Sequence, residues 1–218
     1  MLDIFSVYKP KGPTSHDIID QLRKITGIKR IGHAGTLDPL ASGVLVVGIG
    51  REATKKLGEA VKKEKEYVAT IRLGEESITD DKEGEKKQHE VEKIPTLEDV
   101  QSACAGFIGN IRQMPPVYSS VKVRGKPAYR RVRNGEKVQL GLREVEIKEI
   151  EITSYSWPLL TIRAVTGSGV YIRSLARDIG ETLGVSGYLQ ELERTRVGEF
   201  TIDRATSVEE FGSNCHAE

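Results

Sequence analysis

The feature that most constrains the fold is an uninterrupted apolar run, Val-Leu-Val-Val-Gly-Ile, at residues 44–49. A run of this length without alternating polar residues is typical of a buried strand. Elsewhere the chain combines further strand-like segments with segments whose apolar residues recur every three or four positions, which is the spacing of a helix. Because the strands occur in runs with helices interspersed, the sequence predicts an α+β fold with a mixed, largely antiparallel central sheet flanked by helices.

Local signals place the individual elements. Strands are predicted at residues 4–8, 44–49, 67–73, 118–123, 145–155, 159–165 and 200–202. Helices are predicted to begin at Thr14 or Ser15, near residue 52 and after Thr96, and to span residues 170–183 and 187–194. Gly27 lies just past the first helix, and Asp99 forms a capping box with Thr96. Residues 80–93 are polar and predict a mobile loop.

Length and composition bound the class of protein. The 218 residues suffice for a substantial core, and no repeat is present. One domain is predicted over residues 1–212, with residues 113–142 projecting as a lobe and residues 213–218 as a tail. Apolar runs of at most four to six residues and an N-terminus without a signal-like stretch predict no membrane association. Two cysteines are too few for a disulfide framework, so the expected location is a reducing cytoplasm.

The net charge of +1 hides an uneven distribution. Between Lys122 and Lys137 there are seven basic residues and one acid, whereas residues 75–99 carry ten acids and four lysines. A solvated surface face would explain the basic segment on charge alone. Tyr118 and Tyr129, beside or among these cations, favour a second interpretation, contact with nucleic acid through phosphate charge and base stacking.

A loop that precedes the apolar run holds the candidate catalytic group. Residues 32–43 read Gly-His-Ala-Gly-Thr-Leu-Asp-Pro-Leu-Ala-Ser-Gly and contain a histidine, His33, and a carboxylate, Asp38, directly before a proline. Taken alone, an aspartate before proline most often initiates a turn. The four histidines show no metal-ligand spacing, and no arrangement indicates a catalytic triad, so no metal is predicted. Residues 48–53 form a G-x-G-x-x-A pattern, but no alternation of strands and helices follows it, which disfavours dinucleotide binding.

Six motifs, in order, resemble those of the TruB-type tRNA pseudouridine synthases. They read "KPKGPTSHDII", "GHAGTLDPLASGVLVVGIGREATK", "KEYVATIRLG" with "DDKEG", "QMPPVYSSVKVRGKPAYRRVRNG", "GSGVYIRSLARDIG" and "YLQELERTRVGEF". The resemblance extends from the first strand to about Phe211. It implies isomerisation of uridine 55 in the tRNA T loop to pseudouridine, without a cofactor or metal.

The resemblance also implies roles for individual residues. Asp38 matches the catalytic aspartate, Tyr67 the tyrosine that packs on the target base, and Arg173 the arginine that pairs with the catalytic carboxylate. Three positions, His33, Tyr171 and Leu192, match residues that contact the flipped nucleotide and its surroundings. The basic segment, with Lys122, Arg124, Arg130 and Arg131, matches an insertion that grips the T arm. Within its own helix, Arg173 has no acid three or four positions away, so its partner is expected from elsewhere in the fold.

The chemistry that the resemblance implies would explain the loop. Breaking and re-forming a glycosidic bond requires an ionised Asp38 acting as nucleophile or as base, and the sequence leaves both open. The target base must leave its stack, at a cost of a few kcal/mol, and stacking on Tyr67 would recover roughly 1–3 kcal/mol. Gly32 and Gly35 are expected to let RNA approach the backbone closely.

Several positions depart from the family pattern. They are Ala34, Ser77, Val170 and Glu193. Glu193 replaces an arginine, which is expected to weaken phosphate contact. The chain is expected to comprise the catalytic domain without a C-terminal PUA-type domain and to act as a monomer without a protein partner. Two alternatives remain open: a non-catalytic RNA-binding or RNA-folding module, and a guide-RNA-dependent pseudouridine synthase.

Overall fold

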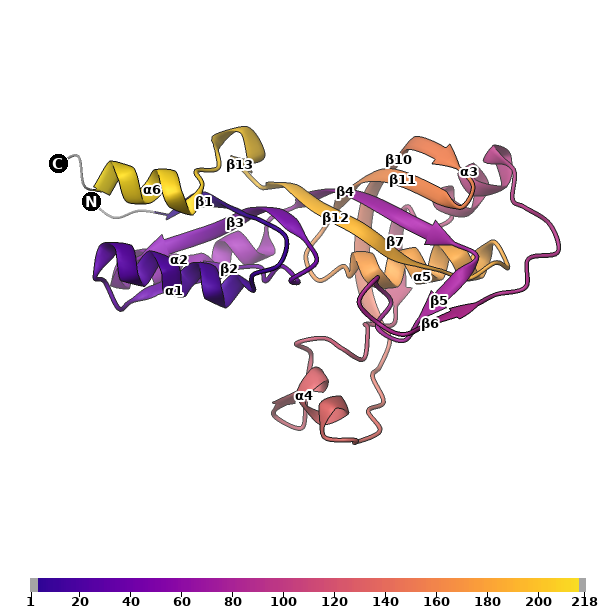
Figure 1. Ribbon diagram of the computed structural model, residues 1–218, viewed down its shortest axis with the longest axis horizontal. Helices are drawn as coiled ribbons and strands as arrows, with labels where there is room; N and C mark the ends of the chain where they lie inside the picture. Colours follow the sequence, from indigo (N-terminus) through magenta and orange to yellow (C-terminus); the bar gives the residue numbers. More distant parts are fainter. Residues whose placement is uncertain (1–3, 216–218) are drawn as a thin grey trace. The chain divides into compact units, whose positions relative to one another are not determined.

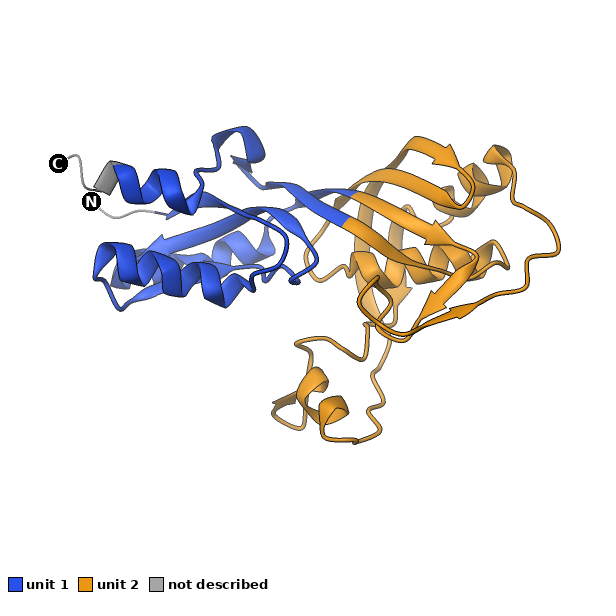
Figure 2. Cartoon of the chain, in the orientation of Figure 1, with its two compact units in different colours: residues 1–68, 192–218 blue, residues 69–191 orange. Residues whose placement is uncertain are grey.

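The computed structural model describes residues 4–215 and divides into two compact units (Figures 1 and 2). Unit 1 comprises residues 1–68 and 192–218, and unit 2 comprises residues 69–191. The boundary falls within two strands, β4 (Lys65–Leu73) and β12 (Gly187–Val197), so each of them contributes residues to both units. The domain predicted for residues 1–212 therefore contains two compact units.

The main sheet has nine strands among the described residues, in the order β1-β3-β12-β4-β11-β10-β7, with β2 beside β3 and β13 beside β12. The remaining strand bounds are β1 Ile4–Lys9, β2 Ile31–Ala34, β3 Ser42–Ile49, β7 Gly109–Gln113, β10 Arg143–Ser156, β11 Leu159–Thr166 and β13 Phe200–Thr201. β3 pairs antiparallel with β1 and β2 but parallel with β12. The pairs β10–β11 and β10–β7 are antiparallel. The prediction of a mixed, largely antiparallel sheet is confirmed.

Unit 1 surrounds β3, which is buried at every position. Leu45, Val47 and Ile49 pack in a cluster with α1 (Ser15–Thr26) and α6 (Val208–Cys215). The alternate residues Val44 and Val46 pack in a second cluster that includes α2 (Arg51–Lys62). Because helices cover both faces of this strand, it needs no polar side chain, which explains the apolar run.

The ends of α1 follow the predicted signals. Thr14 caps the helix by accepting from the N–H of Asp17 at 3.1 Å, and the Asp17 carboxylate accepts from the N–H of Thr14 at 2.8 Å. These reciprocal bonds satisfy backbone donors that no helical carbonyl reaches. Gly27 ends the helix with φ of 69°. The predicted start and end of this helix are confirmed.

Unit 2 places two helices against the antiparallel strands β11, β10 and β7. α3 (Leu97–Ala105) contacts both β10 and α5 (Ile172–Thr182). The apolar face of α5, with Leu175, Ala176 and Ile179, is fully buried. Four short strands and a short helix complete the unit: β5 Glu75–Ser77, β6 Lys86–Gln88, β8 Lys122–Val123, β9 Lys126–Pro127 and α4 Ala128–Arg133. The segment around α4 stands away from the rest of unit 2 (Figure 1).

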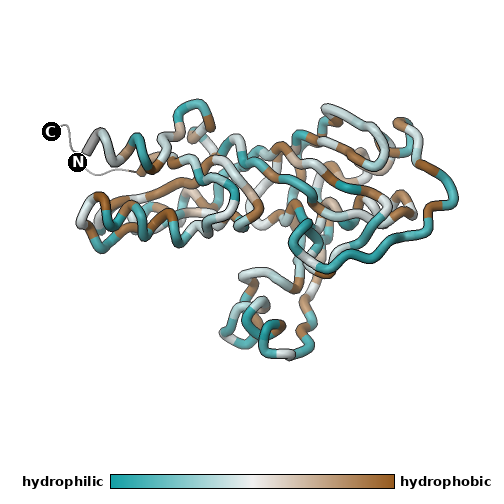
Figure 3. The backbone as a smooth tube through the Cα atoms, viewed as in Figure 1, coloured by the Kyte–Doolittle hydropathy of each residue, from teal (hydrophilic) through white to brown (hydrophobic). Residues whose placement is uncertain are grey.

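Four local predictions need correction. The helix predicted at residues 187–194 is wrong, because these residues form most of β12. The strand predicted at residues 118–123 is confined to Lys122–Val123. The polar segment 80–93, largely hydrophilic in Figure 3, contains β6, which pairs with β5. Of the tail predicted at residues 213–218, residues 213–215 belong to α6, and residues 216–218 lie outside the described part of the chain.

Candidate active site

Asp38 lies in unit 1, in the half-buried segment between β2 and β3. The residue before it, Leu37, is held at both its N–H and its carbonyl by Ser15 at the start of α1. The Ser15 hydroxyl accepts from the N–H of Leu37 at 2.9 Å and donates to its carbonyl at 3.0 Å. Ser15 is 2% exposed, so water competes little for these bonds.

The residues after Asp38 are held by the loop that precedes α1. The Pro39 carbonyl accepts from the N–H of Gly12 at 2.8 Å and from Lys9 Nζ at 3.5 Å. The Ala41 N–H donates to the Asp38 carbonyl at 3.1 Å and closes a turn. The backbone on each side of the carboxylate is therefore fixed by groups from a distant part of the chain.

Two buried cations, Lys65 of β4 and Arg194 of β12, lie beside the loop. A Cβ atom at Gly35 would lie 3.3 Å from Arg194 Nη1 and 3.7 Å from Lys65 Cε. Alternate residues of a strand share a face, so Tyr67 lies on the same face of β4 as Lys65, and Leu192 on the same face of β12 as Arg194. Tyr67 and Leu192, each 7% exposed, therefore lie on the strand faces that carry these two cations.

His33 lies in β2 opposite Val47 of β3. Burial lowers the pKa of its imidazole, and electrostatic interaction with His16 and Arg194 lowers it further. Burial therefore favours the neutral form of the imidazole. Its Nδ1 atom is buried and has no hydrogen-bond partner within the described part of the chain.

Burial lowers the pKa of Lys65 to about 8, and the neighbouring charge of Arg194 acts in the same direction. Its ammonium group donates to the carbonyls of Val61 at 2.8 Å and Lys63 at 2.7 Å. In an unfolded chain the same group would keep its ordinary pKa of 10.5. Between pH 8 and pH 10.5, the folded and unfolded states therefore bind different numbers of protons at Lys65.

This difference predicts a pH dependence of stability. Between pH 8 and 10.5 the unfolded state holds the Lys65 proton and the folded state releases it, so the free energy of unfolding should rise with pH, by about 2–3 kcal/mol from this group. Below pH 8 the contribution of Lys65 to the free energy of unfolding no longer changes with pH. Urea denaturation of the wild type and of Lys65→Met at pH 8 and pH 10.5 measures this rise in the free energy of unfolding. The rise should be smaller in the variant. The exposed Lys62→Met serves as control, and an equal rise in all three proteins would contradict the assignment.

Arg173 lies in unit 2, on α5, and is 5% exposed. Its Nη1 atom lies 3.3 Å from Asp81 Oδ2, and its guanidinium donates to the carbonyls of Thr79 at 3.1 Å and Tyr118 at 2.9 Å. Asp81, itself 4% exposed, also accepts from the Thr79 hydroxyl at 2.6 Å. An acidic partner of Arg173 was expected from a distant part of the chain, and Asp81 is such a partner. Together these contacts fix the guanidinium in position.

A second arginine on α5 extends this charged cluster. Arg177 pairs with Asp80 at 2.8 Å and with Asp178 at 2.7 Å, and donates to the Met114 carbonyl at 3.0 Å. Burial raises the pKa of Asp80 to about 6, against the opposing effect of Arg177.

Tyr171, at the start of α5, is fixed through its backbone. Its N–H donates to the Gln113 side-chain oxygen at 2.9 Å, and its carbonyl accepts from the same amide at 3.2 Å. Because Gln113 is only 1% exposed, this pair of bonds holds the strand end of β7 against α5.

The basic segment 122–137 belongs to unit 2 and surrounds α4. Among the predicted RNA contacts, Lys122, Arg124 and Arg130 are exposed, and Arg130 lies over the ring of Tyr129 at 5.9 Å. Arg131 differs, because it is half-buried, donates to the Val123 carbonyl at 3.1 Å and pairs with Glu136. Its side chain holds the small lobe together.

Comparisons with known proteins identify the family of this chain. Residues 23–172 match the model of the TruB family pseudouridylate synthase N-terminal domain, and residues 173–218 match that of the tRNA pseudouridylate synthase B C-terminal domain. The chain belongs to the TruB family. Membership makes it an enzyme, an isomerase of the tRNA pseudouridine synthase type.

Individual relatives carry the same family name. Proteins named tRNA pseudouridine synthase B from Thermobifida fusca and Corynebacterium diphtheriae are 46% and 43% identical over 95% and 96% of this chain, covering 73% and 72% of their own lengths. Among solved structures, a Cbf5-Nop10-Gar1 complex matches with 30% identity and a TM-score of 0.75 over 97% of this chain. An H/ACA RNP bound to a substrate RNA containing 2'-deoxyuridine matches with 28% identity and a TM-score of 0.72. This chain spans about half of those matched chains, 54% and 53%.

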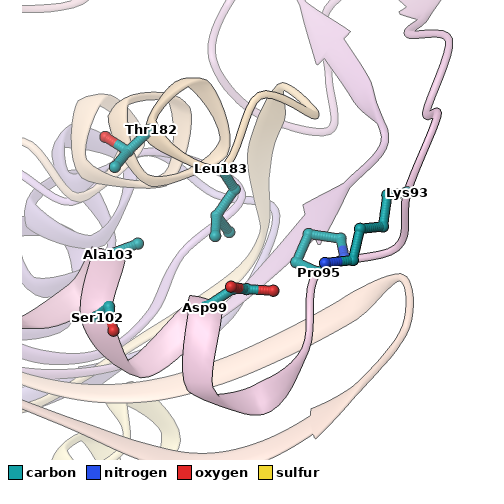
Figure 4. A pocket seen from close by; sticks show the side chains of 7 residues that line it. All are labelled: Lys93, Pro95, Asp99, Ser102, Ala103, Thr182 and Leu183. Atoms are coloured by element: carbon teal, nitrogen blue, oxygen red, sulfur yellow. The ribbon is translucent and has the colours of Figure 1, made fainter.

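Features outside the TruB motifs give less indication of a functional site. A surface pocket of about 470 Å³ in unit 2 is lined by Lys93, Pro95, Asp99, Ser102, Ala103, Thr182 and Leu183 (Figure 4). None of these residues is a predicted site residue, and Asp99 serves as capping partner of Thr96. Within residues 4–215, no group of three or more histidines, cysteines and acids is placed to hold a metal ion. No helix in that part of the chain combines the length and hydrophobicity needed to cross a membrane.

Several residues that shape the TruB site were missed in the sequence. They are Lys9, Ser15, Asp81, Gln113 and Arg194, and all are buried polar side chains. Apart from Asp81, each binds backbone groups of a segment distant in sequence. Such contacts have no periodicity or fixed spacing, which is why pattern analysis does not find them.

Proposed function

We propose that this enzyme converts uridine to pseudouridine at position 55 in the T loop of tRNA, with Asp38 as the catalytic carboxylate. The observation that carries the proposal is the double anchoring of the Asp38 backbone, by Ser15 on one side and by Gly12 and Lys9 on the other. Catalytic groups must be held close to one geometry, because a displacement of about 1 Å can lower the rate about 10²-fold.

The reaction conserves the atoms of the nucleotide. The bond between N1 of uracil and C1′ of ribose breaks, the detached base turns, and C5 bonds to C1′. The hydrogen on C5 then leaves as a proton, while N1 carries one. Asp38 assists either as nucleophile or as base, and both roles require its ionised form.

The remaining predicted site residues supply binding and electrostatics. Tyr67, 7% exposed, stacks on the everted base, and the neutral imidazole of His33 contacts the nucleotide without adding charge. The family resemblance implies that Arg173 pairs with Asp38, which would favour the ionised form of the carboxylate. The buried contact of Arg173 with Asp81 supports this role, since an already ordered guanidinium needs no reorganisation on substrate binding. Tyr171 and Leu192 line the surroundings of the flipped nucleotide.

The exposed cations of the basic segment hold the T arm through its phosphates. The triple variant Lys122→Gln, Arg124→Gln and Arg130→Gln should weaken tRNA binding and reduce the slope of log K against log salt concentration by about 2–3, roughly 0.9 for each lost phosphate contact. Filter binding at several salt concentrations measures the slope. Replacing three exposed lysines of α2, Lys55, Lys56 and Lys62, is the charge-matched control. An identical slope change in both variants would refute a specific role for the segment.

The function test uses unmodified tRNA labelled with tritium at uracil C5. Tritium release together with pseudouridine at position 55 by mass spectrometry is the expected result, with the protein alone as catalyst. Tight binding without product would indicate an RNA-folding module, and activity only with an added guide RNA would indicate a guide-dependent synthase. Comparing full tRNA with a T-arm hairpin tests whether the T arm suffices. We place the enzyme in the cytoplasm, as a monomer that requires no protein partner.

A further inference from the structure

Arg194 is among the largest fully buried side chains in the chain, at 1% exposure. Arginine stays charged at every physiological pH, and a buried charge is costly unless hydrogen bonds compensate it. The residue is not among the predicted contacts of the nucleotide, and it lies in β12 beside β3. Its position raises the question of what its guanidinium does.

The guanidinium binds two backbone carbonyls that bracket the Asp38 segment. Its Nη2 atom donates to the carbonyl of Gly35 at 2.8 Å, and its Nε atom donates to the carbonyl of Val44 at 2.8 Å. Gly35 precedes Asp38 by three residues, and Val44 follows it by six. One rigid, planar group therefore fixes the distance between the two ends of the segment.

The backbone of Arg194 closes on the same segment. Arg194 pairs with Gly43 in the parallel register of β12 and β3. Gly43 has φ of 108°, and a Cβ atom there would lie 2.2 Å from the Arg194 carbonyl oxygen. A side chain at position 43 would push the two strands apart, so the close approach depends on glycine.

We infer that Arg194 is a positioning residue, which sets the location of Asp38 by clamping the carbonyls of Gly35 and Val44. The inference rests on the proposed role of Asp38. It differs from a general electrostatic effect, because a lysine keeps the charge but cannot span both carbonyls with a planar fork. It also differs from simple stabilisation, because it predicts slower chemistry in a protein that remains folded and binds tRNA.

Two variants test the clamp. Arg194→Lys keeps the charge and removes the fork. Gly35→Ala keeps the arginine and places a methyl group 3.3 Å from its Nη1 atom. Gly27→Ala is a matched control in unit 1, because Gly27 has the same φ of 69° as Gly35 but nothing within 4 Å of an added Cβ atom. All three are compared with the wild type by single-turnover rate, tRNA Kd, and hydrogen exchange of the amides of residues 36–41 in the free protein.

The expected result is a single-turnover rate about 100-fold lower in Arg194→Lys and clearly reduced in Gly35→Ala, with Kd within about 3-fold and faster exchange at residues 36–41. Gly27→Ala should keep the wild-type rate and exchange in this segment. The inference would be overturned if the rates of both variants fell only in proportion to the folded fraction, as in the control. It would also be overturned if the tRNA Kd changed while the single-turnover rate did not. If Arg194→Lys fails to fold, Gly35→Ala decides. A wild type without activity on tRNA would refute the proposed function, whereas the exchange data would still test the clamp.

Discussion

Replacing Asp38 by asparagine should abolish tritium release from labelled tRNA and leave tRNA binding intact. The amide keeps the size of the side chain but can act neither as nucleophile nor as base. We expect the single-turnover rate to fall at least about 10³-fold, equivalent to about 4 kcal/mol of transition-state stabilisation, with Kd within about 3-fold. The anchors at Ser15 and Gly12 bind backbone groups and should persist in the variant.

Asp20→Asn provides the matched control for this loss. Asp20 is a half-exposed carboxylate of unit 1 that pairs with Arg23 on α1. Its replacement should change the turnover less than about 2-fold, because surface pairs of this kind contribute little. Substantial residual turnover in Asp38→Asn, measured on protein free of wild-type enzyme, would show that another group performs the chemistry.

Replacing Arg173 by alanine should have two separable effects. Turnover should fall about 10²–10³-fold, because a preorganised positive group is lost from the proposed site. The free energy of unfolding should fall by about 3–5 kcal/mol, because the Asp81 carboxylate, 4% exposed, remains buried without its guanidinium. Urea denaturation and single-turnover kinetics measure the two effects on the same preparation.

A double variant separates the structural from the catalytic contribution. In Arg173→Ala combined with Asp81→Asn, no carboxylate is left buried beside the missing guanidinium, so at least half of the lost stability should return. The turnover should not return, because the arginine itself is absent. Recovery of both quantities together would mean that Arg173 acts only through folding, and that the proposed pairing with Asp38 has no catalytic role.

Local signals predicted elements whose determinants are close in sequence. The helix that begins after Thr14 was predicted from a capping residue, an apolar stripe and Gly27, and all three lie within 14 residues. β12 shows the limit of such reasoning. Leu189, Leu192 and several good helix formers favour a helix there, yet pairing with the distant strands β3 and β4 makes the segment a strand. Tertiary pairing outweighed local propensity.

For the candidate site, the sequence predicted the principal residues but not the residues that hold them in place. The resemblance pointed to Asp38, Tyr67 and Arg173, and the structure supplies what surrounds them: Ser15 beside Asp38 and Asp81 beside Arg173. Glu193 illustrates the difference. From the sequence it is an unfavourable charge near RNA, but its carboxylate accepts from the hydroxyls of Tyr8 at 3.2 Å and Ser42 at 3.3 Å. A pattern predicts the residue type at a site, whereas its hydrogen-bond partners depend on chain segments that only the fold brings together.

The division of the chain into units has a consequence for its synthesis. Unit 2 is one continuous stretch, whereas unit 1 joins both ends of the chain, with Phe5 stacked on Phe211 at 5.1 Å between ring centres. As a ribosome makes the protein from the N-terminus, the apolar strand β3 emerges before the whole of unit 2, and its partner β12 emerges after most of it. At about 5–20 residues per second this interval lasts on the order of ten seconds. During that time β1, β2, α1 and α2 are already available to β3, but β12 at its edge and α6 over one face are not, so unit 1 is completed only when the end of the chain emerges.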